Sequence, residues 1–294
     1  MILVFGSINV DVLVPVPHLP AAGETVLGGD YRLLPGGKGA NQALAARRAG
    51  AEVMMAGAVG NDGFAALALE NLRGDNVDLT LVRRAYRPTG CAAIMVGDAG
   101  ENLIAVAPGA NSAAVSAVIP DSLIGSGTTV LCQMEVPQRE IAALIRRASG
   151  LGAYTVLNLA PAAPLDPDLF GALDLLVANI GETAALDDDP SRIARKLRRG
   201  LVVTRGASGS TAYLADGAQI EVPALAIEPV DTTGAGDNFV GVLAAGLDCG
   251  LPMPAALRRA SAAAALACLA AGAQSAMPDT AEIEAAAARL PETL

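Results

Sequence analysis

A glycine-rich segment near residue 235 places backbone amides beside a carboxylate. The stretch Asp231-Thr232-Thr233-Gly234-Ala235-Gly236-Asp237-Asn238-Phe239 precedes an apolar, helix-compatible run to Leu247. Glycines on both sides of Ala235 let backbone N–H groups point at an anion, and the following helix adds its positive N-terminal end. Asp237 could then take a proton from a hydroxyl that attacks phosphorus. From pattern alone, an ordinary stabilising charge in the first helical turn is an equally good interpretation of Asp237.

A second glycine cluster, Gly36-Gly37-Lys38-Gly39-Ala40-Asn41-Gln42, also opens a predicted helix. It is not a Walker A loop, because no Gly precedes Gly37 at the required distance and no Ser or Thr follows Lys38. Close backbone approach, together with Lys38 and Asn41, would suit a polyhydroxylated ligand. Taken alone, the pattern is also explained by a turn that leads into a helix.

The N-terminal segment Gly6-Ser7-Ile8-Asn9-Val10-Asp11 follows an apolar run that predicts a first strand. Asn9 and Asp11 are two residues apart, so in extended backbone their side chains point the same way. A carboxylate and an amide at a strand end could hold two sugar hydroxyls. The alternative is a strand that simply emerges into solvent.

Short β-rich runs alternate with helix-compatible stretches along most of the chain. Strands are expected at residues 2–5, 53–59, 129–133, 155–159, 173–178 and 201–204, and helices at 41–49, 64–72 and 140–148. This alternation predicts an α/β protein with a mainly parallel sheet covered on both faces. Ligands of such sheets gather beyond the carboxyl ends of the strands.

Two stretches break the alternation. Residues 10–35 mix Val and Leu with many Pro and Gly, and residues 89–107 predict two strands joined at a hairpin turn, Gly97-Asp98-Ala99-Gly100. Together they predict a small β-sheet that stands off the core. We therefore expect one domain over residues 1–294, with a lid formed by inserts at about 12–35 and 88–107.

Composition points to small-molecule partners. The net charge is −10, and the 294 residues include only four Phe, four Tyr and no Trp, which argues against a nucleic-acid surface. The sole histidine, His18, lies among prolines without nearby metal ligands, so a mechanism that needs a catalytic His is disfavoured. The cysteines form no Cys-x-x-Cys pair, so reduced thiols are expected at Cys91, Cys132, Cys249 and Cys268.

No membrane or export segment is predicted. The apolar start has no basic region before it and meets Asp11 early, unlike a signal peptide. The uncharged run 260–277 is mostly Ala and contains Gly272, so we expect a buried helix with Gly272 at or near its end rather than a membrane span. These features favour a cytoplasmic protein.

Taken together, the chain resembles the ribokinase family within the larger group of carbohydrate and nucleoside kinases. The resemblance covers almost the whole chain, and its most specific parts are the Gly-Gly-Lys-Gly-Ala-Asn-Gln and Gly-Ala-Gly-Asp strings in this order and spacing. Further matching segments are Gly6 to Asp11, Gly23-Glu24-Thr25-Val26, Gly100-Glu101-Asn102, Gly109-Ala110-Asn111 and Gly272-Ala273-Gln274. The resemblance implies a three-layer fold with a β-sheet lid, and ATP-dependent phosphorylation of a primary sugar hydroxyl, foremost D-ribose to ribose 5-phosphate.

The resemblance also implies a role for each matched residue. Asp237 corresponds to the general base, and Gly234, Ala235 and Gly236 to the anion hole. The sugar contacts implied are Asn9, Asp11, Gly37, Lys38, Asn41 and Glu135. Asn179 and Glu182 are similar to an element that organises Mg²⁺ and phosphate, and the positions implied around the nucleotide are Thr204, Gly206, Gly209 and Ser261. Seen alone, Glu135 and Glu182 would be interpreted as solvated carboxylates.

Two further implications concern ions and assembly. Ribokinases typically bind K⁺ beside the anion hole, and the matching ligands here are the Asp231 carboxylate and the carbonyls of Thr233, Ala267, Ala270 and Gly272. Ala276 stands where ribokinases often carry a Ser, which predicts weaker K⁺ binding. The alternating apolar residues of the lid strands predict a homodimer. A kinase for fructose, another small sugar or a nucleoside stays open, as does a non-catalytic sugar or nucleotide sensor.

Overall fold

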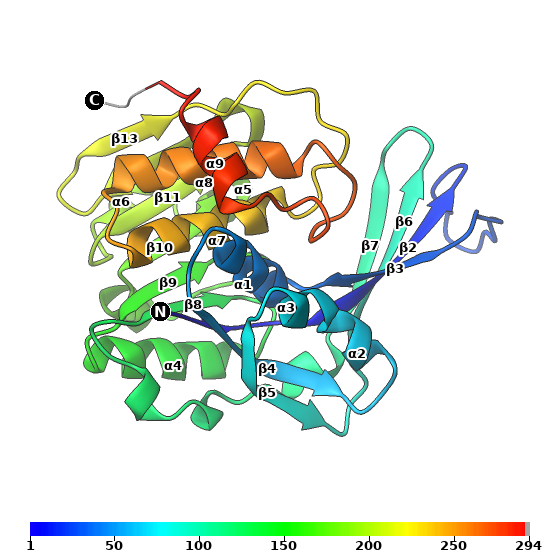
Figure 1. The fold of residues 1–294 in the computed structure, drawn as a ribbon, viewed down its shortest axis with the longest axis horizontal. Helices are drawn as coiled ribbons and strands as arrows, with labels where there is room; N and C mark the ends of the chain where they lie inside the picture. Colours follow the sequence, from blue (N-terminus) through cyan, green and yellow to red (C-terminus); the bar gives the residue numbers. More distant parts are fainter. Residues whose placement is uncertain (292–294) are drawn as a thin grey trace.

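Two β-sheets organise residues 1–291, which the computed structural model describes (Figure 1). The larger sheet has the strand order β13-β12-β11-β10-β9-β8-β1-β4-β5, and the smaller has the order β3-β2-β6-β7. The strands of the larger sheet are β1 (Ile2–Phe5), β4 (Val53–Gly60), β5 (Asp78–Ala85), β8 (Thr129–Gln133), β9 (Tyr154–Asn158), β10 (Leu175–Asn179), β11 (Gly200–Thr204), β12 (Ser210–Leu214) and β13 (Gln219–Val222).

In the larger sheet the neighbouring strands β11, β10, β9, β8, β1, β4 and β5 run parallel to one another. Strands β12 and β13 continue the sheet beyond β11 and are antiparallel to their neighbours. From β1 the chain continues outward to β4 and β5 on one side, and later from β8 to β11 on the other. The order therefore reverses between β1 and β8. Ligands of open parallel sheets bind at such a switch point, beyond the carboxyl ends of the strands.

Helices cover both faces of the larger sheet, as the alternating side chains of β1 show. Ile2 and Val4 point into a core shared with α1 (Lys38–Arg48), α7 (Ala235–Asp248), α8 (Met253–Ala267) and α9 (Thr280–Ala287). Leu3 and Phe5 point into a second core with α4 (Gln138–Gly150) and α6 (Pro190–Ala194). The α/β three-layer architecture expected from the sequence is confirmed.

Several predicted element bounds need correction. The helix expected at 64–72 is two short helices, α2 (Phe64–Ala68) and α3 (Glu70–Gly74), divided at Leu69. The helix expected at 260–277 ends at Ala267, and turns follow, with Gly272 at φ +94°. An Ala-rich run has high helix propensity throughout, but the loop after α8 is held by contacts with residues 230–231 instead. A short helix α5 (Ile180–Ala184) and the strands β5, β12 and β13 were not predicted.

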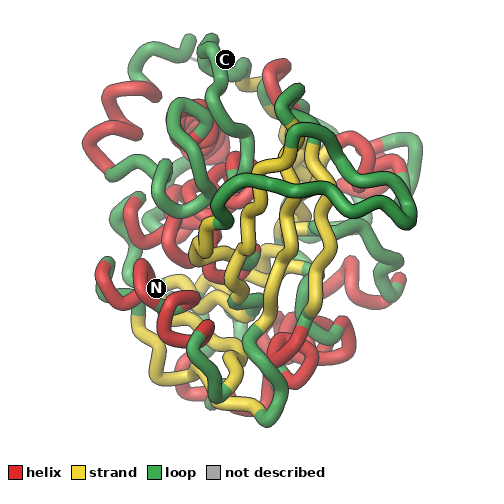
Figure 2. Tube along the Cα trace, turned by 90° about the vertical axis from the view of Figure 1, so that its right-hand side faces the viewer, coloured by secondary structure: helices red, strands yellow, loops and turns green. Residues whose placement is uncertain are grey.

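The smaller sheet projects from the right-hand side of the body in Figure 1, and Figure 2 views the molecule from that side, with the strands of the sheet facing the viewer. It contains β2 (Asn9–Val16), β3 (Arg32–Gly36), β6 (Gly90–Gly97) and β7 (Asn102–Ala107). Its first strand begins at Asn9, three residues before the insert boundary expected at about 12. The four cysteines are free thiols, and no helix of residues 1–291 combines the length and apolarity needed to cross a bilayer.

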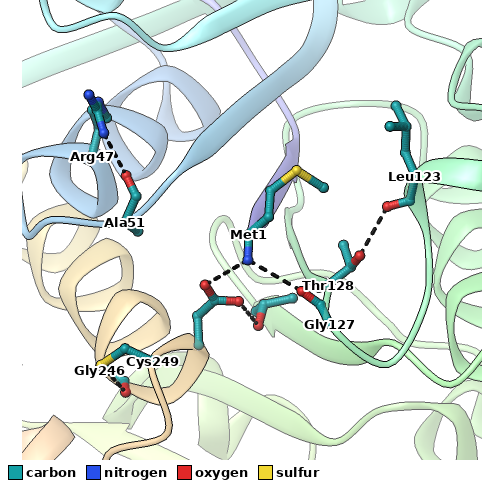
Figure 3. A network of polar contacts seen from close by, with 10 residues as sticks. Met1, Arg47, Ala51, Leu123, Gly127, Thr128, Gly246 and Cys249 are labelled. Atoms are coloured by element: carbon teal, nitrogen blue, oxygen red, sulfur yellow. Dashed lines mark hydrogen bonds and ion pairs between the residues drawn. The ribbon is translucent and has the colours of Figure 1, made fainter.

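The N-terminal amine, just before β1, is held by contacts with α7 and with the segment that precedes β8 (Figure 3). It forms an ion pair of 3.0 Å with Asp248 at the end of α7, and it donates a hydrogen bond to the Gly127 carbonyl. Thr129 Oγ1 donates to the other Asp248 oxygen. These contacts tie β1 and β8 to α7, the helix whose opposite end carries the glycine segment.

Candidate active site

The N-termini of α1 and α7 meet beside the switch point between β1 and β8. Gly234 precedes α7 with φ +76°, a left-handed conformation that glycine adopts at little cost. Gly39 packs so closely on β1 that a Cβ at this position would lie 2.6 Å from the Gly6 carbonyl carbon. Both glycine segments therefore place helix N-termini, with their unpaired N–H groups and positive dipole ends, at one place.

Asp237 lies in the first turn of α7 and is buried, with 8% of its surface exposed. Asn41 Nδ2 donates to its Oδ2 at 2.9 Å, and Gln42 Nε2 donates to its Oδ1 at 2.9 Å. Asp237 also lines a cavity of about 170 Å³. It is thus a fixed acceptor that faces a small polar space.

That cavity collects residues from both glycine segments and from the predicted nucleotide side. Its walls include Gly234, Gly236 and Asp237 from the start of α7, Lys38 from α1, Glu182 from α5, and Asn158, Asn179 and Thr204 from the strand ends. Parallel strands deliver these residues because their carboxyl ends share one edge. The size and the amide-rich lining suit a phosphoryl group.

Lys38 is the positive centre of this cluster. Its pKa is raised above its ordinary value, chiefly by the charge of Asp237 and also by Glu135, Glu182 and Asp11, which outweigh its burial. Four carboxylates around one ammonium leave the cluster with an excess of negative charge. Such a cluster favours a cationic or metal-bound ligand.

The predicted sugar contacts lie on the lid side of the same cluster. Glu135 accepts hydrogen bonds from Ser7 Oγ at 2.5 Å and from the Lys38 backbone N–H at 3.2 Å, which bridges β1, α1 and the segment after β8. Asn9 accepts from Asn111 Nδ2 at 2.7 Å. Asp11 borders a larger cavity of about 460 Å³ between the lid and the core.

Burial raises the pKa of Asp11 from its ordinary 3.8 to about 6, and the charges of Glu135 and Asp237 add to the rise while Lys38 opposes it. Ionised Asp11 therefore lowers the free energy of unfolding. A residue kept ionised at such a cost is a candidate for ligand binding.

Asn179 and Glu182 are hydrogen-bonded to each other as a capping box at the start of α5. Glu182 Oε2 accepts from the Asn179 N–H, and Asn179 Oδ1 accepts from the Glu182 N–H, both at 2.8 Å. Glu182 can cap α5 and still accept hydrogen bonds or bind a cation from the cavity, because each carboxylate oxygen has two lone pairs. Burial raises the pKa of Glu182, while the Asn179 N–H and Lys38 oppose the rise.

Other predicted residues lie outside the smaller cavity. Ser261 is buried in α8, and Gly206 and Gly209 flank the turn between β11 and β12. Asp231 accepts from the Thr233 N–H at 2.9 Å and from the Gly272 N–H at 2.8 Å, so three residues of the implied K⁺ site share one network. The carbonyl of Cys268, between Ala267 and Ala270, accepts from the Val230 N–H.

Four amide residues of the site had no role in the sequence-based prediction. Gln42, Asn158 and Gln274 are joined to Asp237 directly or through one other residue, and Asn111 holds Asn9 and the Ile8 backbone. Gln42 and Gln274 stand inside the matched strings, so their position was a usable signal. Asn158 lies outside these strings, and its only distinguishing feature in the sequence is that it is a polar residue near the end of an expected strand.

The structure combines an anion cradle, a buried carboxylate beside it and a β-sheet lid over an adjoining cleft. These features are typical of a kinase for a small hydroxylated substrate. A family model for pfkB family carbohydrate kinases matches residues 1–280. The chain belongs to the pfkB family of carbohydrate kinases, which confirms the resemblance and the predicted class of enzyme.

Individual relatives agree over nearly the whole length. The ribokinase of Bacillus subtilis is 36% identical over 288 residues, covering 96% of this chain and 98% of that protein. The structure of Arabidopsis thaliana ribokinase complexed with ribose and ATP has a TM-score of 0.89 at 29% identity, covering 97% of this chain and 98% of that one. A Burkholderia thailandensis nucleoside kinase in complex with inosine shares the fold, with a TM-score of 0.86 at 23% identity over 98% and 96% of the two chains.

Replacing Asp11 by Asn should stabilise the protein near neutral pH, and it should raise the sugar KM if Asp11 contacts the sugar as the resemblance implies. The pKa of Asp11 in the folded protein lies above its ordinary value, so protonation of Asp11 stabilises the fold. This stabilisation is complete below about pH 3.8 and is lost as pH rises through about 6. We expect Asp11→Asn to gain about 3 kcal/mol at about pH 7.5, and nothing below about pH 4. Thermal unfolding at both pH values, with the sugar KM, checks this. An unchanged midpoint at pH 7.5 would contradict it.

Proposed function

We propose that this kinase transfers the γ-phosphate of ATP to the primary hydroxyl of D-ribose, giving ribose 5-phosphate. The observation that carries the proposal is the placement of Asp237, a buried carboxylate held by two amides at a helix N-terminus and facing the phosphoryl-sized cavity. The relatives named ribokinase support the choice of sugar.

Each group has a role that follows from its position. Asp11, Asn9, Asn41, Glu135 and the Gly37 backbone orient the sugar from the lid side. Asp237 takes the proton of the attacking hydroxyl as the new O–P bond forms, because an acceptor beside the anion cradle is where that proton must go. Lys38 and the amides of Gly234, Ala235 and Gly236 stabilise the negative charge on the transferred group.

ATP and Mg²⁺ fit the cluster on the nucleotide side. No group of three or more metal-ligating side chains occurs within residues 1–291. Mg²⁺ commonly needs only one or two carboxylates beside substrate phosphates and water, and Glu182 with Asn179 would hold it in that way. The ion would supply positive charge to a cluster in which carboxylates outnumber Lys38. Thr204, Gly206, Gly209 and Ser261 are proposed to lie along the nucleotide.

The substrate is tested by ATP consumption with ribose, fructose, 2-deoxyribose, adenosine and other nucleosides at equal concentrations. We expect the highest kcat/KM for ribose. A ribose value no higher than that of the other compounds would overturn the substrate while leaving the kinase class intact. Binding of sugar and ATP without any ATP consumption would support the alternative of a non-catalytic sensor.

A K⁺ ion is proposed beside the anion cradle, held by Asp231 and the carbonyls of Thr233, Ala267, Ala270 and Gly272. The Asp231 carboxylate already joins the turn before Gly234 to the loop at Gly272, so an ion there would fix the cradle's amides. We expect KCl to raise turnover by about tenfold in Na⁺- and K⁺-free buffer, against an ionic-strength control, with little change in sugar KM. A flat titration in both wild type and Asp231→Ala would rule the site out.

The lid is proposed to close over the sugar within the single 1–294 domain, and to pair two copies as a homodimer. Strand β7 is an unpaired sheet edge, and Leu103, Ile104 and Val106 on it are 42%, 53% and 51% exposed. A second copy would cover this edge. We expect a dimer by sedimentation at micromolar concentration and a monomer for Ile104→Glu, with Leu151→Glu, another exposed apolar position, still dimeric. A monomeric wild type would contradict the assembly.

A further inference from the structure

A chain of two glutamine amides ends on one oxygen of Asp237. Gln133 Nε2, at the end of β8, donates to Gln42 Oε1 at 2.7 Å. Gln42 Nε2, in α1, donates to Asp237 Oδ1 at 2.9 Å and also to Asn158 Oδ1 at 2.9 Å. Both glutamines are fully buried. The chain thus runs from the switch point of the sheet to the carboxylate without contact with solvent.

A second chain of amides ends on the other oxygen. Asn71 Nδ2 donates to Gln274 Oε1 at 3.0 Å, Gln274 Nε2 donates to Asn41 Oδ1 at 3.0 Å, and Asn41 Nδ2 donates to Asp237 Oδ2 at 2.9 Å. Its outer members, Asn71 and Gln274, line the larger cavity under the lid. Two independent routes therefore converge on one side chain.

The carboxylate determines the direction of both chains. An ionised Asp237 only accepts hydrogen bonds, so Asn41 and Gln42 must turn their NH₂ groups toward it and their oxygens away. Each of those oxygens then needs a donor, which Gln274 and Gln133 supply. Every amide dipole in both chains consequently has its positive end toward Asp237, and such chains polarise one another.

This direction has a cost at Gln133. Its Oε1 is buried and has no hydrogen-bond partner among the described residues. Leaving a buried acceptor unpaired destabilises the folded protein, because the oxygen loses its hydrogen bonds to water without gaining another. If the Gln133 amide were reversed, its oxygen would face Gln42 Oε1 and the first chain would lose its donor. The unpaired oxygen is therefore the cost of directing the first chain at the Asp237 carboxylate.

We propose that Gln42 with Gln133, and Gln274 with Asn71, are positioning residues that hold the Asp237 carboxylate at the angle required for proton transfer. The inference rests on the proposed role of Asp237 as general base. None of the four needs to touch the sugar or the nucleotide for this role. Their removal should therefore lower kcat and leave KM for sugar and for ATP nearly unchanged.

The test uses Gln42→Met, which keeps the side-chain length and removes all three side-chain hydrogen bonds, to Gln133, Asp237 and Asn158. We expect kcat to fall by about 10²-fold, the scale of an angstrom-sized misplacement of a catalytic group, with both KM values within about threefold of wild type. Asn71→Ala, at the partly exposed outer end, should fold normally and lower kcat by about threefold. Leu144→Ala, in the opposite core layer, is the stability control, and it should lose thermal stability without losing kcat at a permissive temperature.

A double variant separates positioning from general damage. If Gln42 acts through Asp237, adding Gln42→Met to Asp237→Asn should leave the residual kcat unchanged, whereas independent effects would multiply. A multiplied loss, or wild-type kcat in both Gln42→Met and Asn71→Ala, would overturn the inference while Asp237→Asn alone still reports on the proposed function. Should Asp237→Asn itself remain active, the proposed base fails, and the positioning role fails with it.

Discussion

Asp237→Asn should reduce turnover by about 10²–10⁴-fold, the usual contribution of a general base. The substitution keeps the size of the side chain and one carbonyl oxygen, but it removes the carboxylate that we propose accepts the hydroxyl proton. It also turns an NH₂ group toward Asn41 or Gln42, both of which donate to this position. The protein should still fold, and it should still bind sugar and ATP.

Steady-state kcat and both KM values, with thermal unfolding and equilibrium binding, check this expectation. Asp168→Asn removes an exposed carboxylate that lines neither of the two cavities, so it is a matched control that should keep full activity. If Asp237→Asn keeps more than half of the wild-type turnover, Asp237 does not take part in the mechanism.

Lys38→Met should lower kcat by about 10²–10³-fold, the range seen when one preorganised donor to a developing charge is removed. The reason is the charge balance of the cluster. Asp237, Glu135, Glu182 and Asp11 all raise the pKa of Lys38, so its loss leaves these carboxylates without their shared cation. Phosphoryl groups would then approach a strongly negative site.

The same kinetic measurements at saturating sugar and ATP test Lys38. Lys38→Arg keeps the charge with a different shape, so it should recover part of the lost turnover. Lys196→Met provides the control, because Lys196 lies over the Phe170 ring on the surface, 5.7 Å from its centroid. A Lys38→Met enzyme within threefold of wild-type kcat would remove Lys38 from transition-state stabilisation.

Local chemistry explains why much of the fold and of the cradle was predictable. The alternation of β-rich and helical runs predicts a parallel sheet, and Gly234 before an apolar helix predicts a helix N-terminus. Asp237 follows at a fixed distance in the chain. Its place in the first turn of α7 needs no long-range information.

The partners of Asp237 could not be predicted in the same way. Asn41 and Gln42 come from α1, Gln133 from β8 and Gln274 from the loop after α8, so the amide chains exist only once these elements are packed. The raised pKa of Asp11 likewise depends first on its burial and then on the charges of Glu135 and Asp237, which are distant in the sequence. The end of α8 at Ala267 is set by contacts of the following loop rather than by helix propensity.

The central claim is that phosphate moves from ATP to the primary hydroxyl of ribose, and the proton-coupled ³¹P spectrum of the reaction mixture tests it directly. A phosphate ester at a primary carbon is split by the two protons of that CH₂ group, so the new resonance should be a triplet. It should grow as ATP is converted to ADP, and it should not appear with Asp237→Asn over the same time. A doublet would place the phosphate on a CH carbon, and inorganic phosphate without any ester would show that ribose is not the acceptor; either result would contradict the account.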